Sequence, residues 1–147
     1  NIAEQKGQIE RAIEQVDKAL AIVGTDGRGY KSYLLKKLAL LRRTGVAGRE
    51  EALNVLTALP EEVRRRERLV AERALTHLSL GEPTEAARVW EDRLARRPLD
   101  ARAAAEAGLA WYRAREREKA RQYLRKARSL KPHLNEVRAL AQALGEG

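Results

Sequence analysis

The feature of this sequence that most constrains its fold is a period of 34 residues. Three segments, EEALNVLTALP, TEAARVWEDRLARRP and EKARQYLRKARSLKP, align so that Ala52, Ala86 and Ala120 stand 34 residues apart. Self-similarity at a period of roughly 20 to 50 residues is typical of chains that stack one small structural unit several times. The sequence therefore predicts a repeat array rather than one closed core.

Each of the three segments has the pattern of an amphipathic helix. Leu56, Trp90 and Leu124 follow the aligned alanines by four residues, which places them on the same helix face. Composition agrees, because Ala, Leu, Arg and Glu are abundant helix formers and only 4% of the residues are aromatic. We expect no β-sheet.

A second stripe lies upstream of each segment and has the same period. Its members are Val70, Ala74 and His77 in one repeat and Ala104, Gly108 and Trp111 in the next. Each repeat is therefore expected to be a pair of helices.

Glycine and proline mark the turns between these helices. Gly45 and Gly81 can adopt the left-handed conformation that ends a helix, whereas the third turn, RAREREKA, has no glycine. Pro98 and Pro132, 34 residues apart, stop the preceding helices. Ala52 follows Gly45 by two residues more than the period predicts, so we expect a longer turn in that repeat.

At these residues the chain resembles the tetratricopeptide repeat family. The match is best over residues 101–134, good over 67–100 and weaker over 30–66, and Arg93 stands where the family has a small residue. The resemblance implies an all-α, right-handed α-solenoid of antiparallel helix pairs, with about three full repeats plus a leading and a capping helix.

The expected organisation has five parts. Residues 1–29 form a helix of a partial preceding repeat followed by a loop, within the segment GTDGRGY. Residues 30–66 form a degenerate repeat, and residues 67–100 and 101–134 form two further repeats. Residues 135–147 form a capping helix. Because the first helix resembles the second half of a pair, we expect the array to be part of a longer repeat protein.

The resemblance also implies a binding surface on the first helices of the pairs. The matching positions, which we predict to bind a partner, are Arg42, Arg43, Arg68, Leu75, Leu78, Arg102, Leu109, Tyr112 and Arg113. Leucines there can bury apolar side chains of a peptide segment while the arginines pair with its acidic residues. The implied function is a non-catalytic protein-interaction scaffold for an acidic, partly apolar partner. The alternative is that these leucines only pack against neighbouring helices.

The net charge of +9 leaves an anion- or nucleic-acid-binding module as the alternative function. The densest basic run, at residues 64–66, either contacts phosphates or is solvated and balanced by the glutamates beside it. We favour the second interpretation, and nucleic acid is the less favoured partner, because the basic residues are spread along the chain rather than gathered on one face.

The sequence has no recognisable constellation for catalysis or metal binding. It contains no Cys, and neither His77 nor His133 has a second ligand-type residue at metal spacing in its helix. GTDGRG lacks the Lys-Ser/Thr of a phosphate-binding loop. We expect no enzyme activity, no metal and no cofactor.

The large ring side chains are expected to pack inside the array. His77 falls where the family places a packing aromatic, and Trp90 and Trp111 lie on helix stripes. The compartment and the oligomeric state are left open, since no stretch reaches the roughly 18 apolar residues of a membrane span and a cysteine-free chain suits several compartments. The Ala/Arg-rich composition is typical of bacterial arrays of the resembled family.

Overall fold

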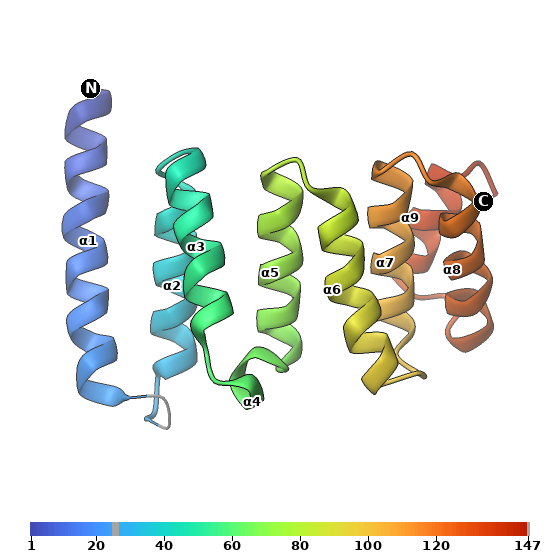
Figure 1. Cartoon of the computed structure of the whole chain (residues 1–147), viewed down its shortest axis with the longest axis horizontal. Helices are drawn as coiled ribbons and strands as arrows, with labels where there is room; N and C mark the ends of the chain where they lie inside the picture. The colour runs from blue at the N-terminus through green and yellow to red at the C-terminus, as the bar shows by residue number, and fades with distance from the viewer. Residues whose placement is uncertain (25–26, 147) are drawn as a thin grey trace. The chain divides into compact units, whose positions relative to one another are not determined.

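The computed structural model describes residues 1–24 and 27–146, and it is built from α-helices (Figure 1). Over these residues it contains no β-strand, so the prediction of an all-α fold of paired helices is confirmed. The chain divides into two compact units, residues 1–58 and residues 59–147, which we call the N-terminal unit and the C-terminal unit.

The N-terminal unit contains α1 (Ile2–Val23), α2 (Tyr30–Arg42) and α3 (Val46–Ala58). Asn1 begins α1, because its side chain accepts a hydrogen bond from the Glu4 amide while the Glu4 carboxylate accepts one from the Asn1 amino group. Helix α2 packs against both α1 and α3. Thr25 and Asp26, within the predicted loop, lie outside the described residues.

The C-terminal unit contains α4 (Glu61–Arg64), α5 (Glu67–Ser79), α6 (Pro83–Arg96), α7 (Ala101–Arg113), α8 (Arg117–Leu130) and α9 (Asn135–Ala143). Helices α5 and α6 form one antiparallel pair and α7 and α8 form the next (Figure 1). Helix α9 packs against both α7 and α8, with Val137, Ala141 and Leu144 buried, so the predicted final helix is confirmed.

Helix α7 lies at the centre of the C-terminal unit, since it packs against α6, α8 and α9. Apart from Trp111, its buried side chains are all small: Ala101, Ala103, Ala104, Ala105, Ala107, Gly108 and Ala110. A Cβ atom at Gly108 would collide with Cδ2 of Leu140 on α9 and lie 3.1 Å from Cβ of Tyr123 on α8. Small side chains on α7 therefore set how closely its neighbours approach.

The two tryptophans fill the larger spaces between these helices. Trp90 on α6 is 3% exposed and Trp111 on α7 is 5% exposed. The prediction that both belong to the core is confirmed.

The turn inside each helix pair has three residues, at 43–45, 80–82 and 114–116. The prediction of a longer turn in the first of these pairs is therefore wrong. Helix α3 instead has six residues ahead of Ala52, whereas α6 has three ahead of Ala86, and Gly45 is the last residue of its turn whereas Gly81 is the middle one. Gly48 permits this, because a Cβ atom at that position would overlap the backbone carbonyl oxygen of Leu41.

The third turn adopts the left-handed conformation without glycine. Gly45 and Gly81 have φ angles of 86° and 75°, as their residue type predicts. Arg115, which is 34 residues after Gly81, has a φ of 66° and is the non-glycine residue with positive φ in the described chain. A side chain in this conformation costs about 1–2 kcal/mol.

We expect Arg115→Gly to raise the free energy of unfolding by about 0.5–1 kcal/mol. The relief of backbone strain exceeds the larger conformational entropy that glycine gives the unfolded chain. Gly81→Ala is the matched control and should lower the free energy of unfolding by about 1 kcal/mol, because a Cβ there meets no atom within 4 Å and only the backbone is strained. Chemical denaturation measures both; a less stable Arg115→Gly variant would contradict the strain.

Candidate functional site

Most of the predicted partner-binding residues lie on the first helices of the C-terminal unit. Arg68, Leu75 and Leu78 are on α5, and Arg102, Leu109, Tyr112 and Arg113 are on α7. Leu75 is 51% exposed, whereas Leu78, Leu109 and Tyr112 are partly buried and pack against the core. Leu75 therefore presents an apolar surface to solvent, and the other three side chains serve the core with part of their surface.

The other two predicted residues belong to the N-terminal unit. Arg42 ends α2 and is half-buried, and Arg43 follows it and is exposed. Arg43 lines a hollow of about 300 Å³ together with Ile9 of α1 and Leu40 of α2.

The same side-chain order recurs along α5 and α7. Arg68, Glu72, Leu75 and Leu78 on α5 are matched 34 residues later by Arg102, Glu106, Leu109 and Tyr112 on α7. Their spacing of four, three and three residues places each set along one side of its helix. We call these two sets the first-helix strips. Each strip begins with an arginine and a glutamate and ends with two apolar or aromatic side chains.

The arginines that begin the strips are paired inside the chain. Arg68 lies 3.5 Å from the Glu72 carboxylate. Arg102 donates a 2.8 Å hydrogen bond to Glu67 on α5, lies 3.9 Å from Glu136 on α9, and stands 5.7 Å from the centre of the Trp90 ring. The predicted pairing of these arginines with a partner would therefore compete with carboxylates of the same unit.

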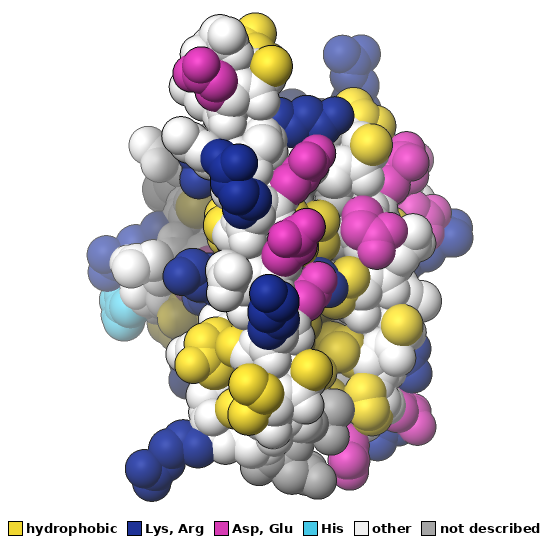
Figure 2. All heavy atoms as spheres, turned by 90° about the vertical axis from the view of Figure 1, so that its left-hand side faces the viewer, with side chains coloured by type: hydrophobic (Ala, Val, Ile, Leu, Met, Phe, Trp, Pro, Cys, Tyr) yellow, Lys and Arg dark blue, Asp and Glu magenta, His cyan; other side chains and the backbone are white. Residues whose placement is uncertain are grey.

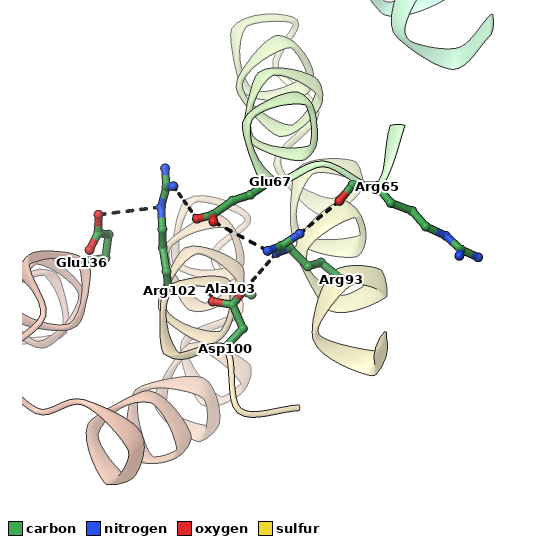
Figure 3. Close-up of polar contacts among 7 residues, drawn as sticks. All are labelled: Arg65, Glu67, Arg93, Asp100, Arg102, Ala103 and Glu136. Carbon is green, nitrogen blue, oxygen red and sulfur yellow. Dashed lines mark hydrogen bonds and ion pairs between the residues drawn. The ribbon is translucent and has the colours of Figure 1, made fainter. Parts of the chain in front are cut away.

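A buried arginine, Arg93, connects the starts of α5 and α7 (Figure 3). Its side chain is 8% exposed, and its Nε donates a 2.8 Å hydrogen bond to Oδ2 of Asp100. Its Nη1 donates to the carbonyl oxygen of Arg65 at 3.1 Å, and its Nη2 lies 3.6 Å from Glu67. Arg93 occupies a position where the resembled family has a small residue, and it links two loops that a small side chain could not reach.

Figure 3 shows that these groups form one continuous chain of alternating charge: Asp100, Arg93, Glu67, Arg102 and Glu136. The carboxylate of Glu67 is shared by two guanidinium groups, and the chain reaches the first turns of α5, α7 and α9. We call it the charge chain. Sequence reasoning missed it, although an arginine at a small-residue position was the signal that could have found it.

Asp100 also begins α7, since its Oδ1 accepts a 3.0 Å hydrogen bond from the Ala103 amide. Burial acts to raise the pKa of this carboxyl group, but the bonds from the Ala103 amide and the Arg93 guanidinium together outweigh burial. The pKa of Asp100 therefore lies below its ordinary value, and the carboxylate stays ionised.

Glu106 has the opposite shift. Burial raises the pKa of its carboxyl group, with the neighbouring Glu136 acting in the same direction and Arg102 acting against it. The Glu106 carboxyl group is therefore less readily ionised than an exposed glutamate.

A second polar cluster ties α6 to α7 and α8. Oε2 of Glu91 accepts hydrogen bonds from Nε1 of Trp111 at 3.1 Å and from the Tyr123 hydroxyl at 2.5 Å. Burial and then the bond to Glu91 raise the pKa of Tyr123 well above its ordinary value. Lys119 lies 4.2 Å from the centre of the Trp111 ring. The cluster positions α8 and leaves no open face on this tryptophan.

The α7–α8 turn carries a hollow of about 480 Å³ lined by Tyr112, Arg113, Arg115 and Arg117. The guanidinium carbon of Arg117 stands 5.6 Å from the centre of the Tyr112 ring. Arg113 and Tyr112 are two of the predicted binding residues, and the structure brings them together here. Arg115 and Arg117 were not predicted.

Two other residues that the sequence singled out, His77 and Arg65, each lie beside a glutamate of the same unit. Nδ1 of His77 lies 3.0 Å from Glu82, and this imidazole is half-buried. In the basic run at residues 64–66, Arg65 pairs with Glu61 at 2.6 Å. The described residues hold no group of three or more side chains placed to bind a metal ion. None of the described helices is long and apolar enough to span a membrane.

Figure 2 shows the face on the α1 side, where acidic and basic side chains alternate and hydrophobic side chains gather toward the C-terminal end of α1. Ile22, near that end, is 85% exposed. On this face, therefore, basic side chains are interleaved with acidic ones and do not gather into one patch.

We expect Arg93→Met to lower the free energy of unfolding by about 2–3 kcal/mol, because it leaves the partly buried Asp100 carboxylate and the Arg65 carbonyl oxygen without their guanidinium donor. Arg96→Met is the matched control. It removes an exposed arginine that pairs with Asp92 at 3.0 Å, and it should cost less than about 1 kcal/mol. Urea denaturation of both variants measures the difference, and similar losses would show that the charge chain contributes little.

We expect Glu106→Gln to raise the melting temperature at about pH 7. A carboxyl group whose pKa is raised by folding contributes stability below its ordinary pKa and loses it as pH rises through the raised pKa. Glutamine imitates the protonated form, so its advantage should vanish near pH 3.5, below the ordinary pKa of about 4.3. Scanning calorimetry at both pH values tests this, with the exposed Glu85→Gln as control. A gain of equal size at both pH values would contradict the assignment.

The fold of this chain is similar to that of a protein of known structure. No family model and no curated protein matches the sequence. The crystal structure of a tetratricopeptide repeat protein from Parabacteroides merdae is similar, with a TM-score of 0.70 and 21% sequence identity over 95% of this chain and 53% of that chain. The present chain thus spans about half the length of that protein. With helix pairs at a period of 34 residues and this similarity, the chain has the fold of a tetratricopeptide repeat protein.

Proposed function

We propose that this chain is a non-catalytic scaffold that binds a polypeptide segment of a partner protein on the first-helix strips. Folds of this kind generally mediate interactions between proteins. They do so because stacked helix pairs leave an extended face that is not needed to bury the core. The strips on α5 and α7 belong to that class of surface.

The observation that carries the proposal is the exposure of Leu75. It is 51% exposed in the middle of the α5 strip, one turn from the partly buried Leu78. Leu109 and Tyr112 give the α7 strip the same apolar end, with Arg113 beside them. A partner that places an apolar side chain on Leu75 would remove that surface from water, which favours association by about 25 cal/mol for each square ångström buried.

The nucleic-acid alternative has weaker support on these strips. Glu72 and Glu106 alternate with the arginines, and Arg68 and Arg102 already pair with carboxylates. A polyanion would have to displace these carboxylates from the two guanidinium groups. A mixed polypeptide segment fits this arrangement better than a phosphate backbone does.

We expect Leu75→Asp to weaken capture of the cognate partner about tenfold or more, because it places a charge where an apolar contact forms. Leu99→Asp is the matched control, since Leu99 is 79% exposed in the loop between α6 and α7 and lies off the strips. The wild type and both variants are immobilised, lysate of the source organism is passed over them with and without nuclease treatment, and bound proteins are quantified by mass spectrometry.

The supporting result is a protein that the wild type and Leu99→Asp retain and that Leu75→Asp loses. Identical retained proteins on all three surfaces would reject the strips as the binding face. Retention that disappears with nuclease treatment would favour the nucleic-acid function instead. Circular dichroism of both variants confirms that the helices are intact.

A further inference from the structure

We infer that the turn between α7 and α8 is an anion-recognition site that receives a cluster of acidic residues from the partner polypeptide. The site consists of Arg113, Arg115, Arg117 and Tyr112, and we call it the arginine turn. The inference rests on the proposed function for the kind of partner. It adds where the acidic part of that partner binds and which way the segment lies on α7.

Three arginines occupy alternate positions around this turn, with Ala114 and Glu116 between them. Arg113 is the last residue of α7, Arg115 lies in the turn, and Arg117 is the first residue of α8. All three are exposed, and they line the hollow of about 480 Å³ with Tyr112 and without any carboxylate among the described residues. Within the described chain none of the three takes part in an ion pair, which separates them from Arg68, Arg93 and Arg102.

The backbone at Arg115 supports a role for its side chain. The corresponding residue of the α5–α6 turn is Gly81, which adopts a positive φ without strain, whereas Arg115 adopts a φ of 66° at a cost. Strained conformations of this kind concentrate at residues whose side chains bind something. Arginine at this position adds a guanidinium group to the lining of the hollow, which glycine could not supply.

The distribution of charge gives the bound segment a direction. At the start of the α7 strip, Arg102 is neutralised by Glu67 and Glu136, and Glu106 adds a further carboxyl group. At its end, the arginine turn carries three cations without a carboxylate partner. A segment along α7 therefore places its acidic residues at the arginine turn and its apolar residues over Leu109.

The same observations favour carboxylates of a polypeptide over a nucleic acid. Single-stranded nucleic acids bind by stacking bases on aromatic rings as well as by charge. The Tyr112 ring is covered by Arg117, and Trp111 is 5% exposed beneath Lys119. The arginine turn thus offers charge-assisted hydrogen bonds in a small hollow, and it offers no ring for a base.

The test uses the purified chain and a fluorescein-labelled hexaglutamate peptide, with binding followed by fluorescence anisotropy at low salt. The triple variant Arg113→Gln, Arg115→Gly, Arg117→Gln should bind about tenfold more weakly, since each exposed charge pair contributes roughly a factor of two to three. The control triple variant is Arg88→Gln, Lys126→Gln, Arg138→Gln, which removes three exposed cations elsewhere in the C-terminal unit. It should change affinity by less than about threefold.

Equal binding of hexaglutamate by the two triple variants would overturn the inference. So would tighter binding of a labelled oligothymidylate than of hexaglutamate, if the arginine variant abolishes it. Arg115→Gly alone provides a second variant that keeps the fold, because the substitution relieves strain, and it should weaken hexaglutamate binding about twofold to threefold.

The result is separable from the proposed function. Hexaglutamate has no apolar side chain to place on Leu75, so its binding tests the arginine turn and not the apolar contact on α5. Partner capture that depends on Leu75 would support the scaffold function. If the arginine variant then binds hexaglutamate as the control variant does, the arginine turn is refuted while the scaffold function stands.

Discussion

The close approach of helices to α7 is the constraint on which the C-terminal unit depends. Alanine and glycine on that helix leave room for α6, α8 and α9 at once, and Gly108 has no space for even one more carbon. Two tryptophans then fill the remaining volume, and Glu91 satisfies the indole N–H of one of them. Small residues determine the spacing, large residues the fit, and polar bonds the orientation of each helix pair.

Charge is divided between structure and surface in this unit. Arg93 and Arg102 are held by Asp100, Glu67 and Glu136, so their charges position the first turns of three helices. The three arginines of the arginine turn are exposed and form no such ion pairs among the described residues, although Glu116 lies beside them in the chain. The net charge of the chain therefore overestimates the number of cations that are accessible to a partner. The positions of cations without an ion pair are more informative than the total charge.

The period, the turn glycines and the apolar stripes were enough to predict the helix pairs, because small residues at fixed intervals are recorded directly in the sequence. The short helix α4 was missed, although Pro60 followed by two glutamates is a helix-start signal. The predicted length of the turn at Gly45 was wrong because a left-handed glycine can be either the second or the third residue of a three-residue turn. The charge chain could not be foreseen in detail, since Arg93 bonds to a backbone carbonyl and to side chains from separate loops.

The sharing of Glu67 between two guanidinium groups has a consequence for how this unit comes apart. In a repeat array whose neighbours interact only through adjacent helices, end repeats can melt while the rest stays folded. Here one carboxylate on α5 is bound to α6 through Arg93 and to α7 through Arg102, and Arg102 in turn meets α9. If α5 unfolds, Arg93 and Arg102 lose the Glu67 carboxylate. If α9 unfolds, Arg102 loses Glu136. The charge chain therefore favours cooperative, all-or-none melting of these helices over stepwise loss from the termini.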